Sequence, residues 1–210
     1  MNKTLIARFT TIGLLATQLL FLPVCAAPET PAPADQSPLE VVTITVDGVL
    51  KVLRNEATSE TARKRQVRAV ISEHFDFAAM ANRVLATNWR KADKRQRTRF
   101  ISLFRELLSN TYWRKISGYT NEEVEYKGER LRSASLATVS TVIKTDSVEI
   151  PVDYKLYLRG KRWMAYDVVI EQVSLVRNYR GSFQDIVHDS GIDGLISQME
   201  IKVAESSVEE

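Results

Sequence analysis

The hydrophobic period of this chain changes once, near Tyr119, and this change limits the fold more than any other feature. Before Tyr119, apolar residues recur every three or four positions, as they do in amphipathic helices. After Tyr119, apolar and polar residues alternate, most clearly over the nine positions Val148–Leu156. This alternation predicts strands with one buried and one wetter face, hence an antiparallel sheet.

Helices are expected on both sides of the strands. They are Pro38–Asn55, Thr58–Phe75, Asp76–Leu85 and Asp93–Tyr119 before the sheet, and Ser174–His188 and Asp193–Ala204 after it. The strands are expected near residues 122–129, 132–145, 148–159 and 162–172. Pro151 lacks a backbone N–H and predicts an edge strand or a bulge. We therefore predict an α+β fold: an antiparallel meander of four or five strands, covered on one face by N- and C-terminal helices.

The first 26 residues have the pattern of a cleavable secretory signal. Lys3 and Arg8 form a short positive region, an eleven-residue apolar stretch follows, and small residues end at Ala26. The apolar stretch is shorter than the about 20 residues that span a bilayer, so no transmembrane segment is expected after cleavage. The alternative is a lipoprotein anchor at Cys25, which the valine before it disfavours.

Charge and motif content exclude several function classes. The net charge is +3, but the residues after the expected signal carry 27 basic and 26 acidic side chains, so no nucleic-acid partner is expected. The sequence has no Gly-rich phosphate loop, no common hydrolase or zinc motif, and one cysteine only. We therefore expect no metal, no cofactor and no catalytic residue.

The remaining titratable candidates also have simpler structural interpretations. His74 and His188 each lie at the end of an expected helix, where a capping or rim role is expected. Asp153 and Asp167 lie in adjacent expected strands, where a curved sheet could aim a carboxylate inward as a general base. Asp153 falls on the polar phase of its strand, and for Asp167 we favour a structural hydrogen bond.

Two surfaces have both a simple and a functional interpretation. Residues 90–99 carry six cations and one acid, which fits a solvated helix face or a docking surface for an acidic partner or anionic head groups. The wide apolar stripe of the helix Asp93–Tyr119 fits an ordinary core, or a space between helices and sheet that another molecule's hydrocarbon fills. Periodicity does not separate these interpretations.

Four stretches of the chain follow one another in an order and spacing that carry a family resemblance. They are FDFAAM (75–80), NWRKADKRQRTRFISLFRELLSNTY (88–112), IPVDYKLYLRGKRWMAYDVVIEQVSLVRNYRGSF (150–183) and GIDGLI (191–196). Together they resemble the MlaC family, also called the toluene-tolerance auxiliary family. The chain departs from the family's pattern at Ala86, where Gly is usual, and at Asp93-Lys94, where a Thr-Pro helix start is usual.

The resemblance implies a periplasmic phospholipid shuttle that helps to maintain the lipid asymmetry of the outer membrane. The implied partners are phospholipid as cargo, an outer-membrane lipoprotein–porin complex, and an inner-membrane ABC transporter with an MCE-domain subunit. In such a protein the acyl chains sit in an apolar pocket between sheet and helices. We expect one lipid-carrier domain at residues 38–204, between a Pro/Ala-rich linker at 27–37 and an acidic tail at 205–210.

The position of each residue in the helical or strand repeat, together with its hydrophobicity, selects the residues expected to line this pocket. From the helix they are Phe100, Phe104, Leu107, Leu108 and Tyr112, and from the strands Val139, Val142, Ile150, Val152, Tyr154, Leu156, Tyr166 and Val168. For partner docking we expect Arg90, Lys91 and Arg97. The helices Asp76–Leu85 and Asp93–Tyr119 are the expected lid.

Two other functions fit the same elements. A periplasmic enzyme with a conical sheet pocket, acting on a small hydrophobic substrate, would place a carboxylate or a histidine at the pocket floor. A structural adaptor would have a filled core. The carrier instead requires a dry apolar cavity deep enough for a fatty tail.

Overall fold

The computed structural model describes residues 34–119 and 121–208, so the expected signal at 1–26 lies outside the described residues. In chain order the elements are α1 (Pro38–Leu53), α2 (Glu60–His74), α3 (Phe77–Leu85), α4 (Asn88–Lys91), α5 (Lys94–Ile116), β1 (Glu123–Ser133), β2 (Leu136–Lys144), β3 (Glu149–Arg159), β4 (Arg162–Ile170), β5 (Val173–Ser174) and α6 (Leu175–Val208). The strands form one antiparallel sheet of order β1-β2-β3-β4-β5. The predicted α+β meander is confirmed, with a two-residue fifth strand.

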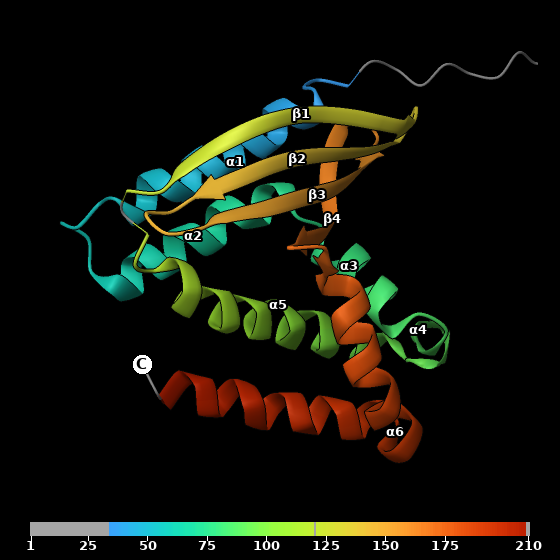
Figure 1. Cartoon of the computed structure of the whole chain (residues 1–210). Helices are drawn as coiled ribbons and strands as arrows, with labels where there is room; N and C mark the ends of the chain where they lie inside the picture. The colour runs from blue at the N-terminus through green and yellow to red at the C-terminus, as the bar shows by residue number, and fades with distance from the viewer. Residues whose placement is uncertain (1–33, 120, 209–210) are drawn as a thin grey trace, which may run out of the picture. The chain divides into compact units, whose positions relative to one another are not determined.

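The helices lie on one side of the arched sheet (Figure 1). α1 packs against β1 and β2, and α3 packs against β4. α6 is divided at Gly191, whose backbone (φ 68, ψ −174) is not helical. Its first part lies beside α3, and its second part runs along α5, where Arg99 forms an ion pair with Glu200 at 2.6 Å. The predicted stop at Gly191 is therefore observed, although the last helix continues past Ala204 to Val208.

Capping side chains define where the helices begin. In α5, the Asp93 carboxylate accepts from the Gln96 N–H at 2.7 Å, and the Gln96 side chain accepts from the Asp93 N–H at 2.9 Å. This capping box satisfies donors that the first helical turn leaves free. It also explains how Asp93-Lys94 can begin the helix without the Thr-Pro pair that is usual in the family. The four-residue α4 between α3 and α5 was not predicted, because a single turn shows no periodicity.

Asp76 joins α3 to the sheet. Its carboxylate caps α3 by accepting from the Ala79 N–H at 2.9 Å, and it also accepts from the Tyr157 hydroxyl and from Arg159 at 2.9 Å. Its own N–H donates to the Ala165 carbonyl on β4 at 2.9 Å. Burial alone would raise the pKa of Asp76, but the bonds from Tyr157 and Ala79 and the charge of Arg159 outweigh burial and lower that pKa.

The substitution Asp76→Asn is expected to lower stability most at neutral pH. A carboxyl whose pKa is lower in the folded state stabilises the fold above its unfolded pKa, and this contribution is lost as the pH falls through the folded pKa. The free energy of unfolding, measured in urea, should therefore differ by about 1 kcal/mol at neutral pH, and the difference should shrink as the pH falls through the lowered pKa of Asp76. The control Asp185→Asn changes an exposed carboxylate on α6. A difference for Asp76→Asn that does not depend on pH would contradict this assignment.

The sheet is irregular at three places. Pairing between β1 and β2 shifts between Tyr126 and Gly128 and again between Leu131 and Ser133. Pairing between β3 and β4 shifts by one residue: Lys155 faces Asp167, but Leu156 faces Ala165. The residue between them on β4, Tyr166, is therefore the extra residue of a β-bulge.

The prediction that Pro151 marks an edge or a bulge is wrong. β3 lies between β2 and β4, and Pro151 pairs in regular register with Val142. The Pro151 carbonyl accepts from the N–H of Glu171, the first residue after β4. Because the N and O of one residue point to the same side of an antiparallel strand, the missing donor falls beyond the end of the β4 ladder and costs no strand hydrogen bond.

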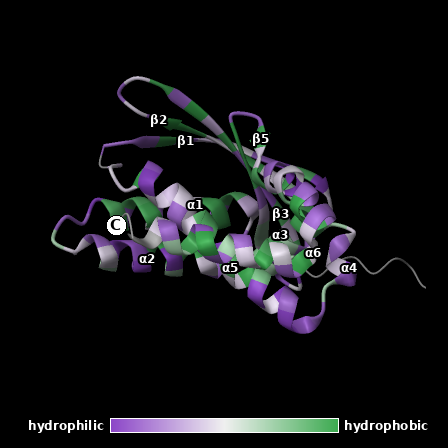
Figure 2. Ribbon diagram, turned by 90° about the horizontal axis from the view of Figure 1, so that it is seen from below, coloured by the Kyte–Doolittle hydropathy of each residue, from purple (hydrophilic) through white to green (hydrophobic). Residues whose placement is uncertain are grey.

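A small apolar cluster joins Leu53 of α1, Val67 of α2 and Trp113 of α5, and there are two larger clusters. One joins α3, α5 and α6 around Phe100 and Phe104, whose rings stack at 5.8 Å. The other joins Val41 and Val42 of α1 to Leu156 and its neighbours on the sheet. Figure 2 shows apolar residues interleaved with polar ones along α1, α2 and α5, as expected for helices with one buried face.

Candidate functional site

A cavity of about 260 Å³ lies between these packed regions, bounded by α1, α2, α5 and the sheet. Its walls are formed mainly by apolar side chains. An apolar cavity of about 150 Å³ in another protein is known to stay dry and to bind a small hydrocarbon. This cavity therefore has the size and the lining to hold apolar matter instead of water.

Each neighbouring element contributes to the lining. The helices supply Thr45, Val46, Val49, Leu50 and Leu53 (α1), Lys64, Val67, Arg68, Ile71 and Ser72 (α2), Phe77 and Met80 (α3), Arg105, Leu108, Ser109, Tyr112, Trp113 and Ile116 (α5), and Leu175 (α6). The strands supply Val124, Ile143, Val152, Tyr154, Val168 and Ile170, and the connecting segments supply Phe75 and Tyr119.

Polar side chains tie α2 to α5 at the edge of the cavity. Arg68 of α2 donates to the Ser109 hydroxyl and, at 2.9 Å, to the Asn110 carbonyl oxygen of α5. The indole N–H of Trp113 on α5 donates to Glu60 of α2 at 2.9 Å. The two helices are thus joined through polar side chains beside the apolar lining of the cavity.

The tyrosines of the cavity wall stay neutral at physiological pH. Burial raises the pKa of Tyr154 to about 12, against a smaller opposing effect of its hydrogen bond with Thr141. Burial and the neighbouring Tyr179 raise the pKa of Tyr112 to about 12. No carboxylate and no histidine line the cavity within the described part of the chain. The wall can therefore hold hydrocarbon, and its described lining offers neither a carboxylate nor a histidine as a general base.

Five of the residues expected in the pocket line this cavity. They are Leu108, Tyr112, Val152, Tyr154 and Val168. The two from α5 share one side of that helix, and the three from the sheet lie on the face that is turned toward the helices. Their contact with a lipid stays a prediction.

Three expected helix residues lie in the core and do not line the cavity. Phe100, Phe104 and Leu107 are buried in the cluster that α5 forms with α3 and α6. The Phe104 ring meets that of Tyr179 of α6 edge-on at 5.3 Å. The apolar stripe of α5 is wider than the cavity, because α6 covers one side of it.

Two expected strand residues face the helices but lie where no space is left. Val139 and Leu156 are fully buried on the inner face of β2 and β3. Val41 and Val42 of α1 pack directly on them. The alternation identified the correct face, but α1 fills that end of it.

Three further strand residues lie outside the cavity for other reasons. Val142 precedes the lining residue Ile143, so its side chain points to the opposite face of β2. Ile150 packs against the core cluster around Phe100 and Phe104. Tyr166 is displaced by the bulge in β4, and its ring lies 4.1 Å from the guanidinium of Arg83.

The residues that the sequence analysis missed come chiefly from α1 and α2. α1 carries β-branched and leucine side chains at helical spacing, and this stripe was a usable signal for a cavity wall. α2 has fewer apolar residues and many cations, so its Val67 and Ile71 gave little indication of a pocket. No pattern within one helix shows whether a facing helix leaves space.

Asp167 has a structural position, on the face of the sheet opposite the cavity. Its buried carboxylate accepts from Lys155 at 2.9 Å, from the Ser174 hydroxyl at 2.7 Å and from the Val176 N–H at 3.1 Å. It therefore holds the first turn of α6, where a negative charge is favourable. His74 ends α2, and His188 is exposed on α6, away from the cavity wall.

The expected docking residues lie around α4. Arg90 and Lys91 are exposed. Arg97 is half-buried: its Nε donates to the Trp89 carbonyl at 3.0 Å, and its guanidinium lies 5.2 Å from the Trp89 ring. Arg97 thus supports α4, whereas the other two face solvent.

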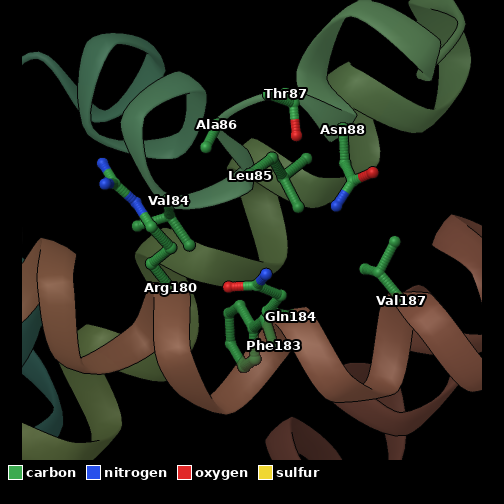
Figure 3. A pocket seen from close by; sticks show the side chains of 9 residues that line it. All are labelled: Val84, Leu85, Ala86, Thr87, Asn88, Arg180, Phe183, Gln184 and Val187. Atoms are coloured by element: carbon green, nitrogen blue, oxygen red, sulfur yellow. The ribbon is translucent and has the colours of Figure 1, made fainter.

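A second hollow, of about 70 Å³, lies where α6 passes the turn after α3 (Figure 3). Gln184 and Phe183 of α6 line it together with Leu85, and Arg180 donates twice to the Arg83 carbonyl. Ala86 in this turn has φ 51 and ψ −118, a conformation that favours glycine. The position at which the chain departs from the family's usual Gly is thus a strained one.

Within residues 34–119 and 121–208, no helix has both the length and the hydropathy needed to cross a bilayer. Over the same ranges, no three His, Cys, Asp or Glu side chains group as they would around a metal ion.

Comparison with known proteins gives relatives of the same fold. A solved structure of a phospholipid-binding protein from Ralstonia solanacearum, in complex with a phospholipid, superposes with a TM-score of 0.75 at 22% identity. The superposition covers 84% of this chain and 99% of that one. The intermembrane phospholipid transport system binding protein MlaC of Haemophilus influenzae is 23% identical over 139 residues. This alignment covers 64% of this chain and 65% of the relative, just under two thirds of that relative's length.

A match at the level of a whole family supports the same relationship. The model of the MlaC protein family matches residues 44–201, which include α2 to β5, most of α1 and most of α6. The matched range contains the cavity lining and extends over more than half of the chain. The chain belongs to the MlaC family.

Proposed function

We propose that this protein binds a phospholipid with its acyl chains in the cavity between α1, α2, α5 and the sheet, and carries it between membranes. The observation that supports this most directly is the cavity itself, which is apolar and has no carboxylate or histidine in its described lining. Its family relative from Haemophilus influenzae is named as a phospholipid transport binding protein. The structurally similar Ralstonia solanacearum protein holds a phospholipid.

The physical basis of retention is the removal of hydrocarbon from water. Burial stabilises each acyl CH₂ by about 0.8 kcal/mol, so a lipid that buries about ten methylenes gains about 8 kcal/mol before the costs of association. Such a cargo leaves slowly unless the cavity opens. Because the acyl chains supply this energy, tight binding does not require a charged group inside the cavity.

Lipid extraction tests the proposal directly. Protein purified without detergent is extracted with organic solvent, and the extract is analysed by mass spectrometry. We expect a stoichiometric amount of diacyl phospholipid. An extract without lipid, from a folded protein that also takes up none from phospholipid vesicles, would exclude the carrier function and leave a structural adaptor with an unusually loose core.

The family also suggests where the carrier works. We infer export to the periplasm, with loading and unloading at an outer-membrane lipoprotein–porin complex and at an inner-membrane ABC transporter with an MCE-domain subunit. This rests on the resemblance and on the signal-like pattern of residues 1–26. Fractionation of cells that produce the full chain, followed by N-terminal sequencing, tests the export and the expected cleavage after Ala26.

Charge reversal is expected to separate docking from cargo binding. Arg90 and Lys91 are exposed on α4 and distant in sequence from most of the cavity lining. The double variant Arg90→Glu/Lys91→Glu should weaken binding to the MCE-domain subunit about tenfold or more at low salt, because reversed charges repel an acidic partner. Lipid content should stay unchanged. The control Arg130→Glu reverses an exposed charge on β1, and equal losses for both variants would refute a docking role for α4.

A further inference from the structure

The charged residues that line the cavity are all cations, and they lie on two facing helices. They are Lys64 and Arg68 of α2 and Arg105 of α5. Among the described lining residues, none is acidic. The other wall elements contribute apolar side chains, tyrosines and a buried threonine. Positive charge is therefore concentrated at one edge of an otherwise apolar cavity.

Helical spacing brings these cations together with hydroxyl groups. Lys64, Arg68 and Ser72 follow one another at intervals of four on α2, so they share one side of that helix. Arg105 and Ser109 have the same spacing on α5. The bond from Arg68 to Ser109 shows that these two sides face each other. The seam between α2 and α5 thus presents cations and hydroxyls, which are the donors that bind phosphate oxygens.

The Arg68 guanidinium is held in position from one side only. Its Nε and one terminal nitrogen donate to Ser109 and Asn110, and Asn110 in turn donates to Ser206 of α6 at 2.8 Å. Both partners are neutral, and Arg68 has no carboxylate within ion-pair distance among the described residues. Its second terminal nitrogen keeps its donors for another group. A guanidinium fixed by neutral partners keeps its full charge for an anion.

Arg105 and Lys64 line the same cavity. Arg105 is exposed and forms no ion pair within the described part of the chain. Lys64 is buried. The seam is therefore electropositive where the cavity meets solvent.

We propose that Arg68 and Arg105 bind the phosphate of the cargo lipid while its acyl chains fill the cavity. This inference rests on the proposed function, and it adds a selection that apolar burial does not provide. Acyl chains alone would retain an uncharged diacylglycerol as well as a phospholipid. A cationic seam favours the lipid that carries a phosphodiester.

A competition between the two lipids tests this selection. Delipidated protein is equilibrated with vesicles that contain equal amounts of dioleoylphosphatidylglycerol and dioleoylglycerol, and the bound lipids are quantified by mass spectrometry. The wild-type protein should favour the phospholipid, and Arg68→Gln/Arg105→Gln should lower that ratio about tenfold or more, since two charge-assisted hydrogen bonds are lost. The matched control Arg65→Gln/Lys94→Gln removes one exposed cation from each of the same helices, outside the cavity, and should keep the wild-type ratio.

The outcomes separate this inference from the function on which it rests. An unchanged ratio with normal total lipid in Arg68→Gln/Arg105→Gln would overturn the phosphate seam and leave the carrier function intact. A wild-type protein that takes up neither lipid would refute both. Inorganic phosphate should leave the wild-type ratio at the value measured in sodium chloride of the same ionic strength. If phosphate lowers the wild-type ratio to that of the variant, the cations bind free phosphate and the proposal is overturned.

A single exposed substitution keeps the test decisive if the double variant does not refold. Arg105→Gln alone alters no hydrogen bond of the described structure and should lower the ratio severalfold. In the wild-type protein the ratio should also fall as sodium chloride is raised, because salt screens partly exposed charges. A ratio that neither Arg105→Gln nor salt changes would contradict the proposal.

Discussion

Replacing Val152 by tryptophan is expected to lower the affinity for phospholipid more than a hundredfold while the protein stays folded. Val152 lies on β3 with its side chain toward the helices, in the wall of the cavity. An indole there would occupy space that about four acyl methylenes would fill, which is worth about 3 kcal/mol of binding. Because the space is already empty, the larger side chain should change the free energy of unfolding by less than about 1 kcal/mol. Lipid extraction and urea unfolding measure the two effects.

The matched control is Val139→Trp on the neighbouring strand. Val139 has the same side chain and faces the same way, but it is fully buried beneath Val41 and Val42 of α1. Overpacking at this position should destabilise the fold by about 1–3 kcal/mol. Equal destabilisation by both substitutions would mean that no usable space exists beside Val152, and the cavity would then fail as a lipid site.

Asp167→Ala is expected to cause the largest loss of stability among the substitutions considered for the sheet. The carboxylate is 4% exposed and accepts from Lys155, from Ser174 and from the Val176 N–H. Removing one member of such a buried, hydrogen-bonded pair leaves the other unpaired, which costs about 3 kcal/mol or more. The midpoint of urea unfolding should fall accordingly, and α6 should lose protection from hydrogen exchange first, because its first turn is released.

The control for this prediction is Asp153→Ala in the adjacent strand. Asp153 is half-buried, and its change should alter stability by no more than about 0.5 kcal/mol. The variant Asp167→Asn keeps the shape but not the charge and should fall between the two. If Asp167→Ala unfolds at the wild-type urea concentration, the bonds to Ser174 and Val176 do not support α6.

The sequence was sufficient for the order of the main helices and strands and for the inner face of β3. Alternation along β3 placed Val152 and Tyr154 correctly beside one another on the face that lines the cavity. Val139 and Val142 are three residues apart and cannot share a face of one strand, so including both was an error that period-2 geometry exposes. The prediction for Tyr166 was wrong for another reason. A bulge residue in β4 reverses which of the residues before it face the helices.

The position of the empty space could not be predicted from local patterns. Leu107 and Leu108 are adjacent and equally apolar, yet one lies in the core with α3 and α6 and the other also reaches the cavity. The difference depends on which parts of α5 and of the sheet are packed against α6 and α1. Contacts between segments distant in the sequence decide this packing. Pro151 illustrates the same limit: the central strand β3 accepts a proline there because β4 ends before it would need the missing N–H.

The two bulges of β1 have a consequence for a protein of this kind. β1 is an outer strand, and a straight outer strand would offer neighbouring copies a row of free backbone donors and acceptors. The shifts at Tyr126/Gly128 and Leu131/Ser133 break that row, and Lys127 and Lys144 pair with Glu125 along the same margin. These features of β1 thereby protect a protein that contains a cavity against edge-to-edge aggregation into fibres.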